Sequence, residues 1–426
     1  MIFDIRDYGA VGDASTLNTQ AIQAAIDACH EAGGGRVLVS GGTYKFGSIR
    51  LKSNVDLHLA ADGVLFGSER CEDFPEPEQM SHVNRVMLPR ERGASMIFAE
   101  EAENISLSGM GRIDCNGKSF VVKREPTYKG WGYTRIDAPT PPRVVFFTGC
   151  KNVRISDITM TNQPAGWSYW IHDCDYVSFD RCKIYAEVDY PNNDGIHINA
   201  SRNVTVSNCD ITCGDDCLVI RANNSSLKEN KVCEKVCATN CNLTSWSGGI
   251  RVGWINDGVI RNCSFSNLVM TDTSVGISLL LPGRGEKRLP DEGRQATLIE
   301  NISFNNIIMD RNNSNPILIH LYDAECTKIE AVRNLYFSNI HARAGEHPYL
   351  LGRKSNIVEN IYFNDCSFER VGKVDLCHGA KGVWREFVKE DTGSIEMKFV
   401  RNVVMNNTVF SNAEEFGVVE LRDKKQ

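Results

Sequence analysis

The feature that most restricts the fold is a short β-type segment that recurs along most of the chain. Each copy has a polar start, an alternating apolar strand, a turn at Asn, Asp or Ser, and a second short strand. The copies read ENISLSGMGRI from 103, KNVRISDITM from 151, DYVSFDRCKI from 175, RNVTVSNCDI from 202, ENISFNNIIM from 300, RNLYFSNIHA from 333, ENIYFNDCSF from 359 and RNVVMNNTVF from 401. The interval is about 24–27 residues where it is clearest, from 151 to 202, and longer where loops are inserted.

Irregular β repeats at this interval predict a solenoid, in which each coil stacks on the next at about 4.8 Å, the spacing of hydrogen-bonded strands. Asn at the turns fits this fold, because Asn tolerates the left-handed backbone conformation and bonds its own backbone. A propeller is the competing fold, but its repeat is nearer 40–50 residues. We therefore predict an all-β protein, a single-stranded right-handed parallel β-helix that forms one domain over residues 1–426.

One helix is expected near the start of the chain, at residues 18–32. Its apolar face follows the helical spacing at Ala21, Ile22, Ala25, Ile26 and Cys29. Asn18 or Thr19 is expected to cap its start, and the three glycines at 33–35 its end. A helix across the end of a sheet stack shields strand edges from unwanted pairing. Residues 1–60 are therefore predicted to form an N-terminal cap and the first coils.

Three segments interrupt the repeat and are predicted to be loop insertions near a cleft: 68–98, 115–142 and 282–297. The first two are rich in charge and proline, and the second carries Tyr128, Trp131 and Tyr133. These aromatic residues have two interpretations, exposed loops or the rim of a cleft in which sugar rings stack. Insertions of this kind are expected to close an open cleft into a pocket.

The composition excludes several classes of partner. The net charge of −7 means that no overall positive field attracts nucleic acid or an anionic membrane. No apolar run reaches the roughly 18 residues that a membrane span needs. The chain opens MIFDIRDYGAVGD, without a basic or apolar leader, which predicts a cytoplasmic protein, or an exported one if a leader has been removed. Association into a homo-oligomer stays open.

The 16 cysteines occur mostly inside apolar β-type runs, where a free Cys acts as a small buried hydrophobe. Cys233, Cys237 and Cys241 stand at equal spacing, but no His or fourth Cys completes a zinc site. We expect no metal and no cofactor.

Two acidic turns precede the short strands GIHI and CLVI: Asn-Asn-Asp-Gly at 192–195 and Gly-Asp-Asp at 214–216. Asp194 and Asp215 lie about one coil apart, so we expect Asp194 directly above or below Asp215, with Asp216 beside it. Crowded carboxylates raise one another's pKa, which can supply both the protonated and the ionised group that an enzyme needs near neutral pH. The alternatives are a polar turn stack that points into water and a Ca²⁺ site.

Over nearly its whole length the chain resembles glycoside hydrolase family 28, the polygalacturonases and their relatives. The opening DYGAVGD, NTQAIQAAIDAC and GGGRVLVSGGTY are typical of pectin-acting β-helix proteins in general. The Asn-x-Asp-Gly at 192–195 and the Gly-Asp-Asp-Cys at 214–217 match two of the family's four active-site motifs. The resemblance implies that Asp215 protonates the glycosidic oxygen while Asp194 and Asp216 activate water, with inversion. Roles within such a coupled trio are not fixed by sequence.

The other two motifs differ from the family. Ser-Gly-Gly at 247–249 replaces Gly-His-Gly, as in the rhamnogalacturonan-hydrolysing branch, and Ser-Leu-Leu at 278–280 replaces the Arg-Ile-Lys that holds a substrate carboxylate. Arg251 and Arg221 are the candidates to replace the lost groups and to hold a substrate carboxylate, and Arg221 stands at a family Lys position. His197 stands where the family often has Asp. The residues predicted to bind substrate are Asn192, His197, Arg221, Gly248 and Arg251.

Three functions remain in competition. The leading hypothesis is an inverting O-glycosyl hydrolase that attacks chain ends of pectin-derived oligosaccharides of rhamnogalacturonan or galacturonan type. The second is a β-helix polysaccharide lyase with Arg221 or Arg251 as the base. The third is a non-catalytic carbohydrate-binding β-helix. The presence of all three aspartates favours hydrolysis.

Overall fold

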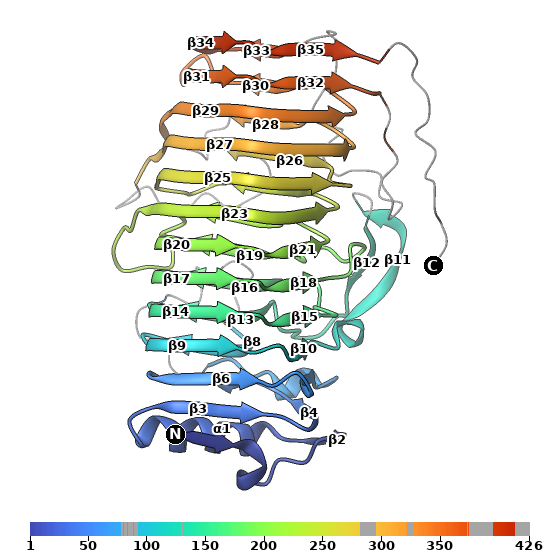
Figure 1. Ribbon diagram of the computed structural model, residues 1–426, viewed down its shortest axis with the longest axis vertical. Helices are drawn as coiled ribbons and strands as arrows, with labels where there is room; N and C mark the ends of the chain where they lie inside the picture. Colours follow the sequence, from blue (N-terminus) through green and yellow to red (C-terminus); the bar gives the residue numbers. More distant parts are fainter. Residues whose placement is uncertain are drawn as a thin grey trace.

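The computed structural model describes residues 1–77, 80, 83, 88, 93–128, 131–281, 295–321, 328–372, 374 and 395–413. Apart from one hairpin, the strands named below pair in parallel with strands of the neighbouring coils, and the coils stack along one axis (Figure 1). Each complete coil contributes to three ladders of strands. The prediction of an all-β, right-handed parallel β-helix is confirmed.

The three ladders are continuous from the first coils to the last. The first contains β1 (Ile2–Asp4), β3 (Gly35–Val39), β6 (Val55–Leu59), β9 (Glu103–Ser108), β14 (Lys151–Ser156), β17 (Asp175–Asp180), β20 (Arg202–Ser207), β23 (Cys233–Ser245), β25 (Val259–Thr271), β27 (Thr297–Asn312), β29 (Ile329–Ala344), β31 (Val358–Asn364) and β34 (Val400–Asn406). The second contains β2 (Asp13–Leu17), β4 (Gly42–Phe46), β7 (Gly63–Gly67), β10 (Arg112–Asp114), β15 (Thr159–Thr161), β18 (Lys183–Tyr185) and β21 (Asp210–Cys213), continues along the long strands β23 to β29, and ends with β32 (Ser367–Arg370) and β35 (Val409–Asn412). The third contains β5 (Ile49–Arg50), β8 (Ser95–Glu100), β13 (Arg143–Thr148), β16 (Trp167–His172), β19 (Ile196–Asn199), β22 (Leu218–Arg221), β24 (Gly248–Val252), β26 (Val275–Leu281), β28 (Ile317–Leu321), β30 (Tyr349–Leu351) and β33 (Glu396–Lys398).

Equivalent positions of the repeat stack in register along the first ladder. Glu300 pairs with Arg333 and Glu359 with Arg401, with shortest side-chain N–O distances of 2.8 and 2.7 Å. The Asn that follows each of these four residues has φ between 54° and 57°. Asn reaches this left-handed conformation more easily than most residues, so the recurrent Asn marks the bend of each coil, as predicted.

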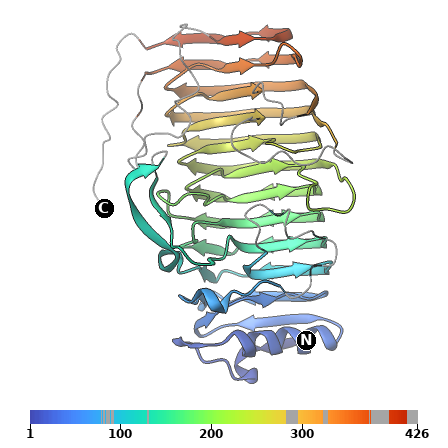
Figure 2. The ribbon, with the colours of Figure 1, turned by 180° about the vertical axis from the view of Figure 1, so that it is seen from behind.

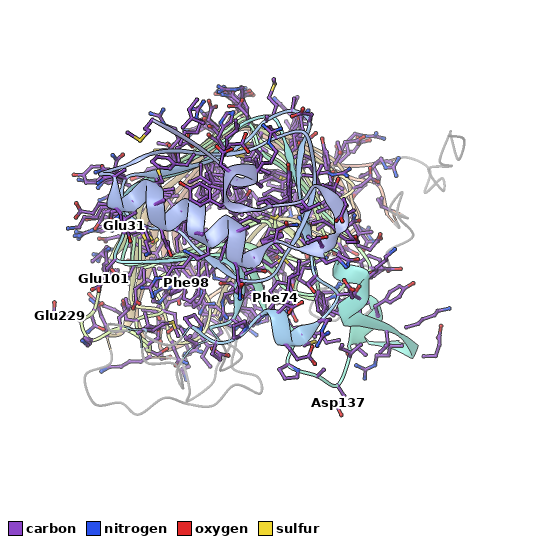
Figure 3. All side chains as sticks on the ribbon, turned by 90° about the horizontal axis from the view of Figure 1, so that it is seen from below. Glu31, Phe74, Phe98, Glu101, Asp137 and Glu229 are labelled. Carbon is purple, nitrogen blue, oxygen red and sulfur yellow. The ribbon has the colours of Figure 1, made fainter. Side chains whose placement is uncertain are left out.

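The helix α1 (Thr19–Glu31) lies across the N-terminal end of the stack (Figures 1 and 3). It buries Ile22, Ala25, Ile26 and Cys29 against the first coils. The three glycines after it all have positive φ, which ends the helix as predicted. Asn18 is the N-cap residue, one of the two predicted, but its side chain bonds the backbone of Val11 and Thr16 instead of the helix.

The insertion at 115–142 contains the short 3-10 helix η5 (Gly117–Phe120) and an antiparallel hairpin, β11 (Val121–Tyr128) and β12 (Trp131–Arg135), which stands beside the coils (Figure 2). Trp131 is 7% exposed, and its Nε1 donates to the carbonyl of Gly214 at 3.1 Å. Tyr133 meets the ring of Tyr190 edge-on. The idea that sugars stack on Trp131 is therefore wrong, because this ring is used to hold the hairpin against an acidic turn.

The other two insertions are described in part. In 68–98, residues 71–73 form the 3-10 helix η2 (Cys71–Asp73), and Met80, Val83 and Leu88 pack on a cluster of aromatic side chains of the third ladder. Within 282–297, residues 282–294 lie outside the described residues. A 3-10 helix, η1 (Ile5–Tyr8), follows β1 at the N-terminus.

Most of the described cysteines are buried, and all of them are free thiols. Cys233 and Cys241 are buried while Cys237 is exposed, so these three side chains do not converge on one point. In the part of the chain that the structure describes, no helix is long and apolar enough to cross a membrane.

Candidate active site

The three aspartates lie in the turns that lead into two neighbouring strands of the third ladder, β19 and β22. Ile196 pairs with Leu218, and the amide of Gly195 donates to the Asp216 carbonyl at 3.0 Å. This register places Asp194 in line with Asp216, so the predicted stacking of Asp194 on Asp215 is wrong by one residue. The coil is one residue longer than the separation of Asp194 and Asp215.

Asp216 is the most enclosed of the three, with 1% of its surface exposed. Its Oδ1 accepts a hydrogen bond from the Ser247 hydroxyl at 3.1 Å, and its Oδ2 contacts Nη1 of Arg251. The guanidinium carbon of Arg251 lies 3.8 Å from the centre of the Trp254 ring. Both carboxylate oxygens therefore face hydrogen-bond donors, which fixes the position of the group.

The charge of Arg251 interacts with the charges of all three aspartates. Burial acts to lower the pKa of Arg251, but the charges of Asp216, Asp215 and Asp194 outweigh burial and raise it. Arg251 was predicted to bind substrate. In the structure it binds Asp216.

Asp194 contacts the imidazole of His197, with 3.3 Å between Oδ2 and Nδ1. Burial lowers the pKa of His197 well below its usual value, and the charges of Arg221 and Arg251 lower it further. The ring is therefore neutral, and the contact is a hydrogen bond rather than an ion pair. Trp167 stacks on His197 at 4.1 Å between ring centres, which fixes the ring plane.

Asp215 is 7% exposed, and its Oδ2 accepts a hydrogen bond from the Asn192 side chain at 3.2 Å. Asn192 has φ of 59°, so its turn depends on a residue that tolerates the left-handed region. The Asp215 carbonyl accepts from the Ser245 hydroxyl. Asn192 is thus placed to orient the Asp215 carboxyl group. Its amide is a neutral donor, whereas Asp216 has the cation Arg251 as a donor.

Arg221 is directed away from Asp194, Asp215 and Asp216. Its Nε lies 2.9 and 2.8 Å from the two carboxylate oxygens of Asp257, and its Nη2 donates to the Ile255 carbonyl at 3.0 Å. Asp257 is fully buried. Burial raises the pKa of Asp257, and the charge and hydrogen bond of Arg221 act against this increase. The Arg221 charge is therefore already balanced within the protein.

Position 248 requires a glycine because the Asp216 carboxylate lies very close to it. A Cβ added at Gly248 would lie 2.6 Å from Asp216 Oδ1. We expect Gly248→Ala to push this carboxylate away from Ser247 and Arg251 and to lower kcat about 10–100-fold, because displacements near 1 Å have effects of this size. Gly132→Ala is the matched control, since its Cβ would meet the Asp189 carboxylate at an ordinary 3.5 Å. Equal kcat in the two variants would contradict this role.

Sequence reasoning missed the part that two residues, Ser247 and Arg143, play in the site. Ser247 was noted only as part of a changed motif, yet its hydroxyl reaches Asp216. Arg143 is fully buried, with its guanidinium carbon 4.1 Å from the centre of the Trp170 ring. Its register position, paired with Trp167, gave no signal in the sequence because the neighbouring strands lie 24 residues apart. Among the described residues, no three His, Cys, Asp or Glu side chains are arranged to hold a metal ion.

On the C-terminal side of the site, the residues that replace the Arg-Ile-Lys motif contact other parts of the protein. Ser278 pairs with Arg251 in the ladder, and its hydroxyl donates to the Ile250 carbonyl at 3.2 Å. Leu280 is buried in a small cluster with Leu318. This stretch of wall is therefore less polar than the family motif implies.

His320 lies beside this wall, paired with Leu280. Burial, with a smaller contribution from Arg353, lowers its pKa to about 4. Because the unfolded pKa is about 6.5, the stability due to neutral His320 is fully present above pH 6.5 and is lost as the pH falls towards 4. Between pH 7 and pH 4.5 we expect the unfolding midpoint of His320→Gln to change less than that of the wild type. The difference corresponds to up to about 3 kcal/mol of unfolding free energy. An unaltered pH dependence in His320→Gln would refute the assignment.

Comparison with known proteins identifies the family of the chain. The sequence model of glycosyl hydrolases family 28 matches residues 86–387. The chain belongs to this family. A second model, described as rhamnogalacturonase A/epimerase, pectate lyase-like, matches residues 2–88. This family 28 member is therefore a hydrolase of glycosidic bonds.

The relatives include plant and bacterial enzymes. An exo-poly-alpha-D-galacturonosidase of Dickeya chrysanthemi is 30% identical over 255 residues, 50% of this chain and 41% of that protein. A probable polygalacturonase of Arabidopsis thaliana is 24% identical over 337 residues, 72% of this chain and 67% of that protein. Among solved structures, an exopolygalacturonase from Thermotoga maritima superposes with a TM-score of 0.72 at 21% identity, covering 95% of this chain and 92% of that one. This last likeness concerns the fold.

Proposed function

We propose that the protein is an inverting glycosidase that releases single sugars from the ends of short pectin-derived oligosaccharides. The observation that carries the proposal is the placement of three carboxylates in adjacent turns, with a different hydrogen-bond partner for each. Asp216, against Arg251 and Ser247, is suited to act as a base on water. Asp194, which lies in register with Asp216, assists it. Asp215, whose identified side-chain partner is the neutral Asn192, is the proton donor.

Attack on chain ends is supported by the covering of one side of the site. Val83 of the first insertion forms a bridge with Leu227, and it packs with Met80 and Leu88 on the aromatic cluster that contains Trp170. A covered wall next to the aspartates favours a pocket over an open groove. The names of the Dickeya and Thermotoga relatives indicate exo-action in those proteins.

The substrate is proposed to be a rhamnogalacturonan-type fragment rather than plain polygalacturonate. Both cations that were predicted to receive a substrate carboxylate already contact a protein carboxylate, Arg251 on Asp216 and Arg221 on Asp257. A desolvated uronate without a cation is costly to bind. If the enzyme is cytoplasmic, as the sequence predicts, imported oligosaccharides would be its substrates.

The test is a panel of short rhamnogalacturonan and galacturonan oligosaccharides together with polygalacturonic acid. We expect single sugars from the short oligosaccharides, weak hydrolysis of the polymer, and an inverted anomeric centre in early proton NMR of the product. Rapid loss of polymer viscosity would overturn exo-action, and retention would overturn the assigned roles. New absorbance at 235 nm without hydrolysis would establish the lyase instead.

A further inference from the structure

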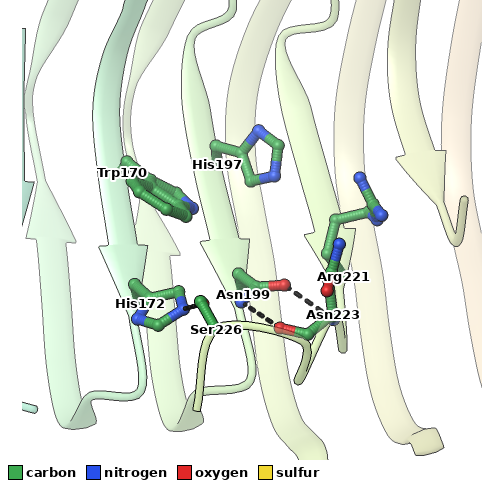
Figure 4. A pocket seen from close by; sticks show the side chains of 7 residues that line it. All are labelled: Trp170, His172, His197, Asn199, Arg221, Asn223 and Ser226. Atoms are coloured by element: carbon green, nitrogen blue, oxygen red, sulfur yellow. Dashed lines mark hydrogen bonds between the residues drawn. The ribbon is translucent and has the colours of Figure 1, made fainter. Parts of the chain in front are cut away.

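A small pocket lies on the third ladder (Figure 4). Its lining is formed by Trp170, His172, His197, Asn199, Arg221, Asn223 and Ser226. His197 connects it to the site, because the same ring contacts Asp194. Asp194 lies in the turn before β19 and His197 within that strand, with 3.3 Å between Asp194 Oδ2 and His197 Nδ1, so one side chain separates the pocket from the aspartates. A sugar adjacent to the cleaved bond reaches this far.

The pocket presents two hydrogen-bond donors. The indole Nε1 of Trp170 is buried and meets no hydrogen-bond partner among the described residues. Figure 4 shows this nitrogen turned towards the space beside His172 and His197. Arg221 uses Nε for Asp257 and Nη2 for a backbone carbonyl, so Nη1 is the group available to a ligand. An indole N–H and a guanidinium can only donate, so both require an oxygen acceptor.

The pocket also presents one acceptor. His197 is neutral, and its Nδ1 faces a carboxylate, which only accepts. The ring proton is therefore on Nδ1, and Nε2 carries a lone pair. A ligand atom in contact with Nε2 has to donate a proton.

The rest of the lining is held in place by the protein. The two ring nitrogens of His172 lie 3.0 Å from the Thr148 hydroxyl and 3.1 Å from the Ser226 hydroxyl. The Asn199 amide exchanges two hydrogen bonds with the backbone of Asn223. These bonds fix the loop that follows β22, so the pocket is formed before any ligand arrives.

The combination of donors, acceptor and charge selects one kind of group. A carboxylate would set its oxygens against the lone pair of His197 Nε2 and would gain little from Arg221, whose charge Asp257 balances. A hydroxyl accepts from an N–H and donates to Nε2 at the same time. We propose that this pocket recognises one hydroxyl group of the sugar next to the cleaved bond, with Trp170 and His197 determining specificity. The inference rests on the proposed glycosidase function.

The first test uses the wild-type enzyme and monodeoxy analogues of an oligosaccharide that it cleaves. One analogue should lose about 10–100-fold in kcat/KM, because it leaves buried donors and an acceptor without a partner. If every analogue is cleaved as well as the parent, the pocket holds only a fixed water and the inference fails, while the proposed function stands. If the parent oligosaccharides are not cleaved at all, the proposed function itself fails.

The second test is Trp170→Phe, which removes the N–H and keeps a ring on Phe146. It should raise KM about tenfold for the parent, with kcat nearly unchanged, and have no further effect on the sensitive deoxy analogue. Trp131→Phe is the matched control, because it removes an indole N–H that lies outside the pocket on Gly214. Trp131→Phe should change kcat/KM for the parent and for every deoxy analogue by the same factor. The same uniform loss in Trp170→Phe would show a merely structural role and overturn the inference.

Discussion

Replacing Asp215 by Asn is expected to lower kcat by about 10²–10⁴-fold, the range that proton transfer contributes in enzymes. Asp194→Asn and Asp216→Asn should have losses of the same order, because water is activated only where both carboxylates remain. Asn has nearly the shape of Asp, so the turns should keep their conformation. The measurement is kcat on a short pectic oligosaccharide, with the melting temperature recorded for each variant.

Asp210→Asn is the control for these three variants. Asp210 lies on β21 of the second ladder, where its carboxylate accepts from the Tyr185 hydroxyl. It is the same residue type and is close in sequence to Asp215, yet it belongs to another face of the coil. It should retain wild-type kcat. Near-wild-type activity in any two of the three site variants would remove these aspartates from the proposed mechanism.

The fold could be predicted because its signals are local. The αL turn after Glu300 needs only Asn301 itself, and the alternation of apolar residues that follows it defines a strand without reference to any other coil. The helix at the N-terminus likewise follows from its own apolar face and the glycines after it. Such signals lie within ten or so residues, so one sequence is sufficient to read them.

The sequence predicted that the three aspartates lie near one another, but it did not give their contacts. The spacing brought Asp194 and Asp215 together to within one residue, and the error came from the length of a single coil. The pairing of Arg221 with Asp257 joins the end of β22 to a residue 36 positions later, which no periodicity links. Trp131 donates to Gly214 across 83 residues, from a hairpin that interrupts the repeat. Contacts of this kind require the register of the whole stack.

Arg251 shows how much depends on such a contact. From sequence it was predicted to hold a substrate carboxylate, which would make Arg251→Ala mainly a KM variant. In the structure its Nη1 is on Asp216, and its side chain is 13% exposed beside a carboxylate that is 1% exposed. Removing one partner of a buried ion pair leaves the other charge uncompensated, which costs about 3–5 kcal/mol.

Arg251→Ala is therefore expected to lower kcat by at least about 100-fold, with KM changed less than about threefold, and to lower the melting temperature. The physical reason is that Asp216 loses its only cationic donor among the contacts described above and no longer has a fixed position for activating water. Arg251→Lys keeps the charge but not the planar guanidinium on Trp254, so it should recover part of kcat and most of the stability. Steady-state kinetics and thermal unfolding of the two variants check this. An unchanged kcat with a raised KM in Arg251→Ala would show that the side chain leaves Asp216 to bind substrate, and the assignment of Asp216 as the supported base would then be wrong.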